Sequence, residues 1–208
     1  LLPAFGLGVA DPVEQQAFGV ARNERAAWFD ESMAVLRAAW TGEPFTHHGD
    51  RYHYDDLRIL PAPRQQHLDV WLGGIAPAEL RRVGRLGDGW LPSFVLPDDA
   101  ARGREVIEEN LALHGRTIDD DHYGALVPYS MGPVPPAVLA GLAKRRPDLA
   151  DPSVLVPQGW DQLMAMLERM LNPPGSRSAP APARPIPARP VNVPVSVSVP
   201  EQTSPNPA

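Results

Sequence analysis

The sequence contains no cysteine, no long apolar run and no excess of positive charge, and each absence excludes a class of protein. Without cysteine there is no disulfide framework, no thiolate metal site and no cysteine nucleophile, a composition that fits a reducing, cytoplasmic compartment. No apolar run reaches the length of a membrane span, so no membrane partner is expected. The net charge of −6 and the scattered basic residues argue against a nucleic-acid partner.

The chain divides by composition into a main domain and a tail. Its 208 residues, 43% of them hydrophobic, suffice for one domain with a sizeable core, which we place at residues 1–171. Residues 172–208 are rich in proline and lack aromatic residues, so they are expected to form a disordered or polyproline II tail. Two PxxP patterns beside arginines, at 182–185 and 187–190, match what SH3-type grooves bind, although such patterns arise readily by chance in proline-rich sequence.

The stretch from residue 69 to residue 92 predicts a strand, a glycine turn, a helix and a second strand in close succession. Residues 69–72, Asp-Val-Trp-Leu, form a short apolar and aromatic run of the kind found in buried strands. The run ends at Gly73 and Gly74, where the backbone can adopt positive φ and approach a ligand closely. Pro77 suits the first turn of a helix, because its missing N–H would be unpaired there.

The helix after this turn is expected to bury one face and to lead directly into the second strand. The positions that should face inward recur at near-helical spacing: Leu80, Val83, Gly84 and Leu86. Three arginines should face outward: Arg81, Arg82 and Arg85. Gly87 is expected to end the helix, and the second strand follows at residues 89–91. A right-handed crossover would make the two strands parallel neighbours or near neighbours.

The backbone around the glycine turn is suited to bind an anion. Free N–H groups of Gly74, Ile75 and Ala76, together with the positive end of the helix, could hold a phosphate group without any charged side chain. Glycine turns before helices are also common in α/β proteins that bind nothing there, so a simple tight turn is the alternative.

Two elements are expected before this stretch. Residues 1–9 predict a strand that ends at Gly6-Leu7-Gly8, where the glycines either let a flat ring approach closely or form a β-bulge. Residues 20–41 predict a helix with an apolar stripe that faces the core. The stripe consists of Phe29, Met33, Leu36 and Trp40.

Residues 45–54 predict a small hairpin with three histidines, His47, His48 and His53. Alternation along a strand sends His47 and His48 to opposite faces, and no cysteine or well-placed carboxylate completes a tetrahedral set. We therefore predict no metal site, and interpret the hairpin as a lid or an interface element.

The rest of the domain predicts further alternation of helices and strands. Helices are expected at residues 97–114, 136–145 and 159–171, and a strand at residues 123–130. The acidic run at residues 119–121 is interpreted as a solvated loop. Short strands alternating with helices indicate an α/β fold with a parallel sheet.

Three stretches, in this order, resemble the bacterial luciferase-like monooxygenase family, especially its deazaflavin-dependent (coenzyme F420) branch. They are FGLG at residues 5–8, ERAAWFDE at residues 24–31 with the helix that continues from it, and LGGIAPAELRRVGRLGDGWLP at residues 72–92. The resemblance implies a (β/α)8 TIM barrel, which normally needs about 250 residues. We therefore expect the chain to be an incomplete barrel, its C-terminal part, followed by the disordered proline-rich tail.

The resemblance also implies a cofactor site. Gly73, Gly74, Ile75 and Ala76 would bind the phosphate of coenzyme F420 or FMN through backbone N–H groups. Gly6 and Gly8 would pass close to the ring system, and Trp90 would wall the pocket. Family members commonly carry serine or threonine at the position of Ala76, so this chain keeps the backbone contacts and lacks a hydroxyl donor.

The function implied is hydride transfer between a flavin or deazaflavin and a small-molecule substrate at the C-terminal face of the barrel. No catalytic acid or base is assigned, because the residues that would carry these roles lie on early strands that the chain is expected to lack. Open sheet edges would favour association, so a homo-oligomer is a further expectation. The alternatives are a catalytically inactive remnant or an interaction protein that works through its proline-rich tail.

Overall fold

The computed structural model describes residues 1–8 and 12–172. The proline-rich segment from residue 173 to residue 208 lies outside the described residues. All structural statements below concern the described part of the chain.

A parallel sheet lies at the centre of the described residues. It contains β1 (Ala4–Phe5), β4 (Trp71–Leu72) and β5 (Gly89–Trp90) in the order β1-β4-β5. Phe5 pairs with Leu72, and Leu72 pairs with Trp90. The two strands predicted around the glycine turn are therefore parallel neighbours, joined by α3 (Pro77–Leu86), and the predicted α/β class is confirmed for this part. Of the strand predicted at residues 1–9, the described residues 1–8 contain one short paired strand, β1.

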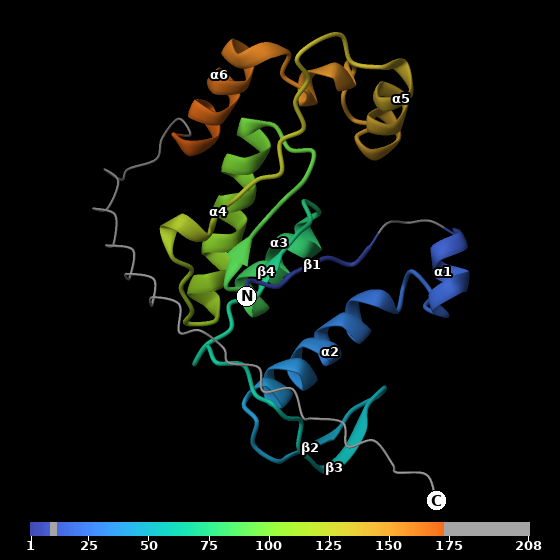
Figure 1. Cartoon of the computed structure of the whole chain (residues 1–208), viewed down its shortest axis with the longest axis vertical. Coiled ribbons are helices and arrows are strands. Elements are labelled where there is room, and N and C mark those ends of the chain that lie inside the picture. Colours follow the sequence, from blue (N-terminus) through green and yellow to red (C-terminus); the bar gives the residue numbers. More distant parts are fainter. Residues whose placement is uncertain (9–11, 173–208) are drawn as a thin grey trace, which may run out of the picture. The chain divides into compact units, whose positions relative to one another are not determined.

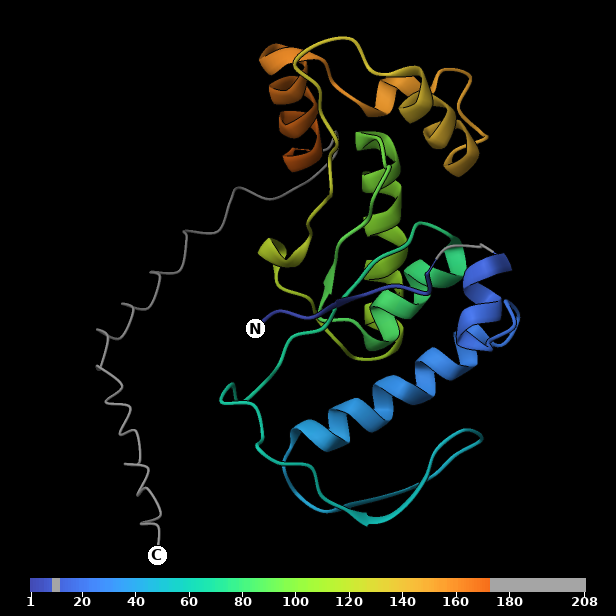
Figure 2. The ribbon, with the colours of Figure 1, turned by 45° about the vertical axis from the view of Figure 1, so that its right-hand side comes forward.

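The segment between β1 and β4 contains two helices and a hairpin. These are α1 (Pro12–Phe18), α2 (Arg25–Trp40), β2 (Phe45–His48) and β3 (His53–Leu57). The hairpin is antiparallel, as predicted, and lies beside α2 (Figures 1 and 2). The helix predicted at residues 20–41 begins later, because residues 22–24 form a turn, and α1 was not predicted at all.

Three helices follow β5, close to their predicted bounds. They are α4 (Pro97–Leu113), α5 (Pro136–Arg145) and α6 (Gly159–Leu171), with short 3₁₀ turns at Asp120–His122 and Pro152–Leu155. Among the described helices, none combines the length and apolar character that crossing a membrane requires.

The strand predicted at residues 123–130 is wrong. The structure shows only isolated parallel bridges there, from Tyr123 to Trp90, from Leu126 to Ser93 and from Ser130 to Gln158. Pro128 has no N–H to donate and Gly124 adds no packing side chain, so this segment cannot sustain a continuous ladder.

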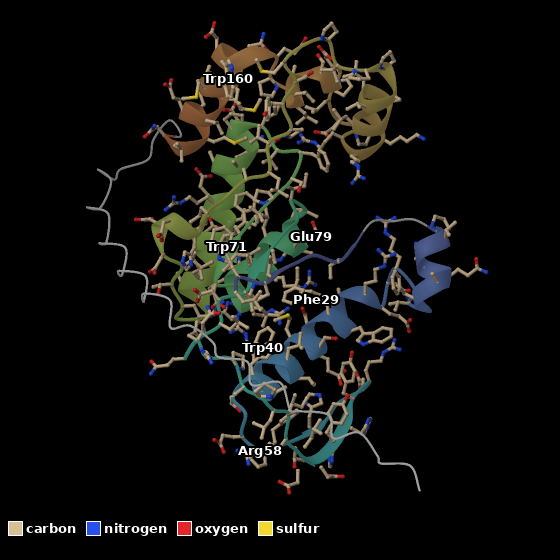
Figure 3. All side chains as sticks on the ribbon, viewed as in Figure 1. Phe29, Trp40, Arg58, Trp71, Glu79 and Trp160 are labelled. Atoms are coloured by element: carbon tan, nitrogen blue, oxygen red, sulfur yellow. The ribbon has the colours of Figure 1, made fainter. Side chains whose placement is uncertain are left out.

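The main core lies between α2, the sheet, α3 and α4. Its buried residues are Met33, Val70, Leu72, Leu80, Val83, Trp90, Ile107 and Leu111. The predicted stripe of α2 is confirmed, since Met33 is buried and Phe29, Leu36 and Trp40 pack against the same cluster (Figure 3). A second, smaller cluster contains Leu142, Leu155 and Val156.

Two details of α3 differ from expectation. Arg82 was expected to face outward but is only 8% exposed, and its Nε donates to Asp30 Oδ1 on α2 at 2.7 Å. A charge can be buried here because the carboxylate of Asp30 compensates it. Gly87 ends α3 as expected, yet with φ of −83° it is not a left-handed residue.

The carboxylate of Asp88 joins several elements at the N-terminal end of the strands. Its Oδ2 accepts hydrogen bonds from the N–H of Val70 at 3.0 Å and from Arg37 Nη2 at 2.7 Å, and its Oδ1 accepts from Arg116 Nη2 at 2.9 Å. Burial raises the pKa of Asp88, but the hydrogen bond from Val70 and the guanidinium of Arg37 outweigh it, so the pKa lies below its ordinary value. Asp88 therefore holds α2, β4 and the segment after α4 together as an anion.

Helices α3 and α4 touch at Gly84. A Cβ atom at this position would lie 2.6 Å from Asn110 Cβ, 2.9 Å from Ile107 O and 3.1 Å from Leu111 N. Because two of these are backbone atoms, the helices would have to move apart.

We expect Gly84→Ala to lower the free energy of unfolding by about 1–3 kcal/mol in denaturant titrations. Gly141→Ala on α5, where nothing lies within 4 Å, should leave stability unchanged or raise it; equal effects of the two variants would contradict the packing.

Asp88→Asn should lower the free energy of unfolding by about 3 kcal/mol at neutral pH, since it leaves the two arginine partners uncompensated. Because the folded pKa is lowered, this stabilisation is complete above the ordinary aspartate pKa of about 3.9 and is lost as the pH falls through the folded pKa. The difference from wild type should therefore shrink in strong acid.

Asp98→Asn is the control. It breaks an ion pair with Arg169 in which both side chains are about 60% exposed, so it should lower the free energy of unfolding by less than about 1 kcal/mol. A larger loss for Asp98→Asn than for Asp88→Asn would contradict this account.

Candidate functional site

The structure brings two of the predicted glycine segments together at the C-terminal edge of the sheet. Because β1 and β4 are parallel neighbours, the residues that follow them leave the sheet side by side. The N–H of Gly73 donates to the carbonyl of Phe5 at 2.8 Å. A small cavity at this point is lined by residues of both segments and of α3, among them Gly6, Gly73, Glu79 and Arg82.

The turn after β4 has the conformation that its glycines allow. Gly74 has φ of +103°, in the region that favours glycine, and its carbonyl accepts a hydrogen bond from Trp90 Nε1 at 2.9 Å. Trp90 is 2% exposed and lines neither of the two cavities described here. The indole therefore supports the turn from the core side, whereas the expected role was a pocket wall; its contact with a cofactor stays a prediction.

Two of the three N–H groups predicted to be free at the start of α3, those of Ile75 and Ala76, are already paired. Ile75 N–H and Ala76 N–H both donate to Glu79 Oε2, each at 3.0 Å. A carboxylate thus lies where a phosphate was expected, at the positive end of α3. The N–H groups of Ile75 and Ala76 thus converge on one acceptor oxygen. Glu79 was missed in the sequence, although glutamate three residues after a helix N-cap is a known signal for this contact.

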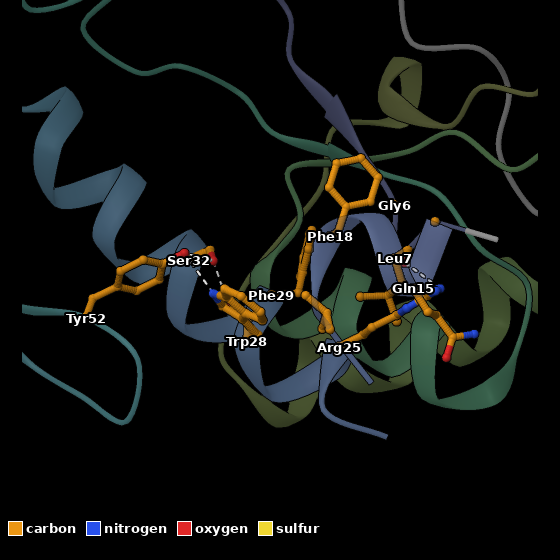
Figure 4. A pocket seen from close by; sticks show the side chains of 11 residues that line it. Gly6, Leu7, Gln15, Phe18, Arg25, Trp28, Phe29, Ser32 and Tyr52 are labelled. Carbon is orange, nitrogen blue, oxygen red and sulfur yellow. Dashed lines mark hydrogen bonds between the residues drawn. The ribbon is translucent and has the colours of Figure 1, made fainter. Parts of the chain in front are cut away.

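A larger cavity lies beside the residues that follow β1. Its volume is about 390 Å³, within the range of small-molecule sites, and Figure 4 shows its lining. Gly6, Leu7 and Gly8 form one wall. The aromatic side chains that line it are Phe18, Trp28, Phe29 and Tyr52. Apolar and aromatic walls with a glycine edge are suited to a flat ring system.

Polar contacts fix the outer wall of this cavity. Trp28 Nε1 donates to the hydroxyl of Tyr52 at 2.8 Å, and Ser32 Oγ lies 3.1 Å from the same hydroxyl. Glu31 accepts hydrogen bonds from the N–H groups of Tyr52 and Arg51. Partial burial raises the pKa of Glu31, but these hydrogen bonds bring the pKa below its ordinary value. The hairpin tip is therefore held against α2 by an ionised carboxylate.

Arg25 contributes a positive charge to the same cavity. Its Nη1 donates to the carbonyl of Leu7 at 3.3 Å, and its side chain belongs to the lining. The N-terminal end of α2 thus presents a guanidinium next to the glycine segment after β1 (Figure 4).

The hairpin histidines make separate contacts, two of them with carboxylates that the sequence analysis did not expect. His47 Nε2 lies 3.1 Å from Glu31 Oε1, and His48 Nε2 lies 2.7 Å from Asp55 Oδ1. His53 stacks on His48. The three histidines therefore do not converge on one point, and none of them belongs to a group with metal-like spacing among the described residues.

Two other groups of side chains have metal-like spacing among the described residues. His67, Asp69 and Asp88 form one, but Asp88 already neutralises Arg37 and Arg116, so a further cation would meet two positive charges. Asp119, Asp121 and His122 form the other, with both carboxylates exposed, as expected for a solvated loop. Neither geometry supports a metal assignment.

Comparisons with known proteins agree on one family and one fold. The sequence profile of the family described as luciferase-like monooxygenase matches residues 4–183. An uncharacterized protein of Mycobacterium tuberculosis is 32% identical over 156 residues, which cover 62% of this chain and 54% of that protein. The chain thus spans about half the length of the curated relatives it matches.

Two solved structures have the same fold over part of their length. One is an F420-dependent secondary alcohol dehydrogenase in complex with an F420-acetone adduct, with a TM-score of 0.55 and 21% identity over 80% of this chain and 51% of that chain. The other is the oxygenating constituent of 3,6-diketocamphane monooxygenase from Pseudomonas putida in complex with FMN, with a TM-score of 0.53 and 18% identity over 69% of this chain and 43% of that chain.

The support of the turn by Trp90 can be tested directly. Trp90→Phe keeps an aromatic ring but leaves the carbonyl of Gly74 without its donor and a gap beside Gly103. We expect a loss of about 2 kcal/mol in the free energy of unfolding. Trp160→Phe is the control, because Trp160 is 61% exposed, and it should change stability by less than about 0.5 kcal/mol. Equal losses in the two variants would show that the hydrogen bond to Gly74 contributes little.

Proposed function

Because the chain belongs to the luciferase-like monooxygenase family, we propose that it forms the cofactor-binding part of an oxidoreductase that uses FMN or coenzyme F420. The chain would supply part of a (β/α)8 barrel. The active sites of such barrels lie at the C-terminal ends of the strands. The α/β fold matches luciferase-like barrel proteins over part of their length, which supports this placement.

The observation that carries the proposal is the pairing of an anion with the backbone after β4. Ile75 N–H and Ala76 N–H converge on one carboxylate oxygen at 3.0 Å, and both residues are exposed. A phosphate oxygen requires the same donors in the same place. Gly73 and Gly74 shape the turn that presents these donors. Ala76 adds no hydroxyl, so the backbone would bind the phosphate alone.

The larger cavity would hold the ring system of the cofactor. Gly6 and Gly8 leave room at its edge, and the adjoining small cavity connects Gly6 with Gly73 at the phosphate side. The side chains of Trp28 and Phe29 offer apolar surface to a flat ring and exclude water from it. When bound, the flavin or deazaflavin supplies the atom that accepts or donates hydride, and the small-molecule substrate would approach from the open side.

A titration of the full chain with FMN and with coenzyme F420 tests this function. Wild type should bind at least one of the two. Gly74→Ala should bind at least about tenfold more weakly, because its φ of +103° is strained for alanine and its Cβ would enter the space beside the Ile75 and Ala76 N–H groups that the phosphate would need.

Gly115→Ala provides a matched control for that strain. Gly115 follows α4, has φ of +61° and has open space around its Cβ position. Gly115→Ala therefore introduces alanine at a positive φ, as Gly74→Ala does, but leaves the turn after β4 unchanged. It should bind as wild type does. If the folded wild-type chain binds neither cofactor, the proposal fails and an inactive remnant or an interaction protein becomes the better description.

A further inference from the structure

We propose that the larger cavity binds a planar ring ligand that carries a negatively charged group, and that Arg25 recognises this charge. The proposal rests on the function proposed above, which places a ring system in the same cavity, and adds the charge of the ligand. It starts from the lining, in which Arg25 is the charged side chain among the described residues. Ligand sites typically combine apolar walls with a few polar or charged groups that fix the orientation of the ligand.

The guanidinium of Arg25 lies at the wall that follows β1 (Figure 4). Its Nη1 donates to the carbonyl of Leu7 at 3.3 Å, and a Cβ built on Gly8 would lie 3.9 Å from the same nitrogen. The guanidinium is therefore close to the backbone of both residues, at the glycine edge of the cavity. A carbonyl is neutral, so the contact with Leu7 holds the side chain without cancelling its charge.

No carboxylate belongs to the cavity lining among the described residues. Three acidic residues of the same stretch of chain bind other groups: Glu24, Asp30 and Glu31. Their partners are Arg51, Arg82 and the N–H of Tyr52, respectively. The described lining thus carries a positive charge on otherwise neutral walls, and an anionic group of a ligand would complement it.

The aromatic walls are suited to a flat ring. Trp28 is fixed before any ligand binds, because its Nε1 donates to the hydroxyl of Tyr52 at 2.8 Å and the guanidinium of Arg51 lies 4.5 Å from its ring centroid. A wall that is already ordered loses little freedom on binding. Phe18 lines the cavity but is 75% exposed, so it lies at the rim. A ring that covers Phe18 removes apolar surface from water, which favours binding.

An arginine distinguishes a carboxylate from a neutral group of the same shape. Its planar guanidinium can donate two parallel hydrogen bonds to a carboxylate, and such charge-assisted bonds are about twice as strong as bonds between neutral groups. A carboxamide has one acceptor oxygen and no charge. The cavity should therefore prefer a ring with a carboxylate over the same ring with a carboxamide.

The experiment measures the affinities of the full chain for 2-naphthoate and 2-naphthamide, which share a flat ring system and differ in charge. Amide and indole ¹H–¹⁵N spectra locate binding, since Leu7, Gly8 and Trp28 report on the cavity. Arg25→Met removes the charge but keeps an apolar stem, and Arg25→Lys keeps the charge without the planar fork. Arg81→Met, at an exposed position on α3 outside the cavity lining, controls for net charge. Thermal melting verifies that each variant is folded.

We expect wild type and Arg81→Met to bind 2-naphthoate roughly tenfold more tightly than 2-naphthamide, with shifts at the cavity residues. Arg25→Met should bind both probes about equally, and Arg25→Lys should keep about a threefold preference for 2-naphthoate. A purely structural role of Arg25 would weaken both probes alike and leave the ratio of their affinities unchanged. That unchanged ratio would overturn the proposal. Binding of neither probe by wild type, equal binding of both, or shifts confined to residues outside the cavity would do so as well.

Parallel titrations with FMN and coenzyme F420 separate this proposal from the function proposed above. Binding of a cofactor without a preference for 2-naphthoate would overturn the charge recognition alone. A preference for 2-naphthoate that depends on Arg25, in a chain that binds neither cofactor, would support the charge recognition and overturn the function. Where a cofactor binds and the preference is seen, displacement of 2-naphthoate by the cofactor assigns the charged group to the cofactor, and simultaneous binding assigns it to the substrate.

Discussion

The turn after β4 is held from two sides, and these two contacts determine how the C-terminal edge of the sheet is arranged among the described residues. The indole of Trp90 donates to the carbonyl of Gly74 from the core, and the carboxylate of Glu79 accepts from Ile75 and Ala76 at the surface. Only glycine fits the φ of +103° between these contacts. The strand can therefore pass into α3 within a few residues, with the helix N-terminus exposed at the edge of the sheet.

The opposite end of the strands serves stability. Asp88 binds the N–H of Val70 and the guanidinium groups of Arg37 and Arg116 there, away from the glycine turn. Gly84 lets α4 pack closely against α3. This separation agrees with barrel enzymes in general, where the C-terminal ends of the strands carry chemistry and the N-terminal ends carry stability. Changes at Asp88 should therefore affect folding, whereas changes at Gly74 and Glu79 should affect binding.

The sequence predicted local structure well and contacts across the chain poorly. The path from β4 through α3 to β5 was recognised because glycine, proline and periodic apolar residues each restrict the backbone locally. Arg82 was placed on the wrong side, since its partner Asp30 lies on another helix and no local pattern connects them. The segment at residues 123–130 has apolar residues typical of a strand but forms only isolated bridges. Glu79 did carry a local signal, because it lies three residues after the N-cap of α3, but that signal was overlooked.

The central claim is that the backbone of Ile75 and Ala76 binds the phosphate of a flavin or deazaflavin. Amide ¹H–¹⁵N spectra of the full chain, recorded during additions of FMN and of coenzyme F420, test it most directly. The account predicts that the largest shifts fall on Gly74, Ile75 and Ala76, with further shifts at Gly6 and Gly8 beside the larger cavity. Binding that moves other amides and leaves those of Ile75 and Ala76 in place would contradict it.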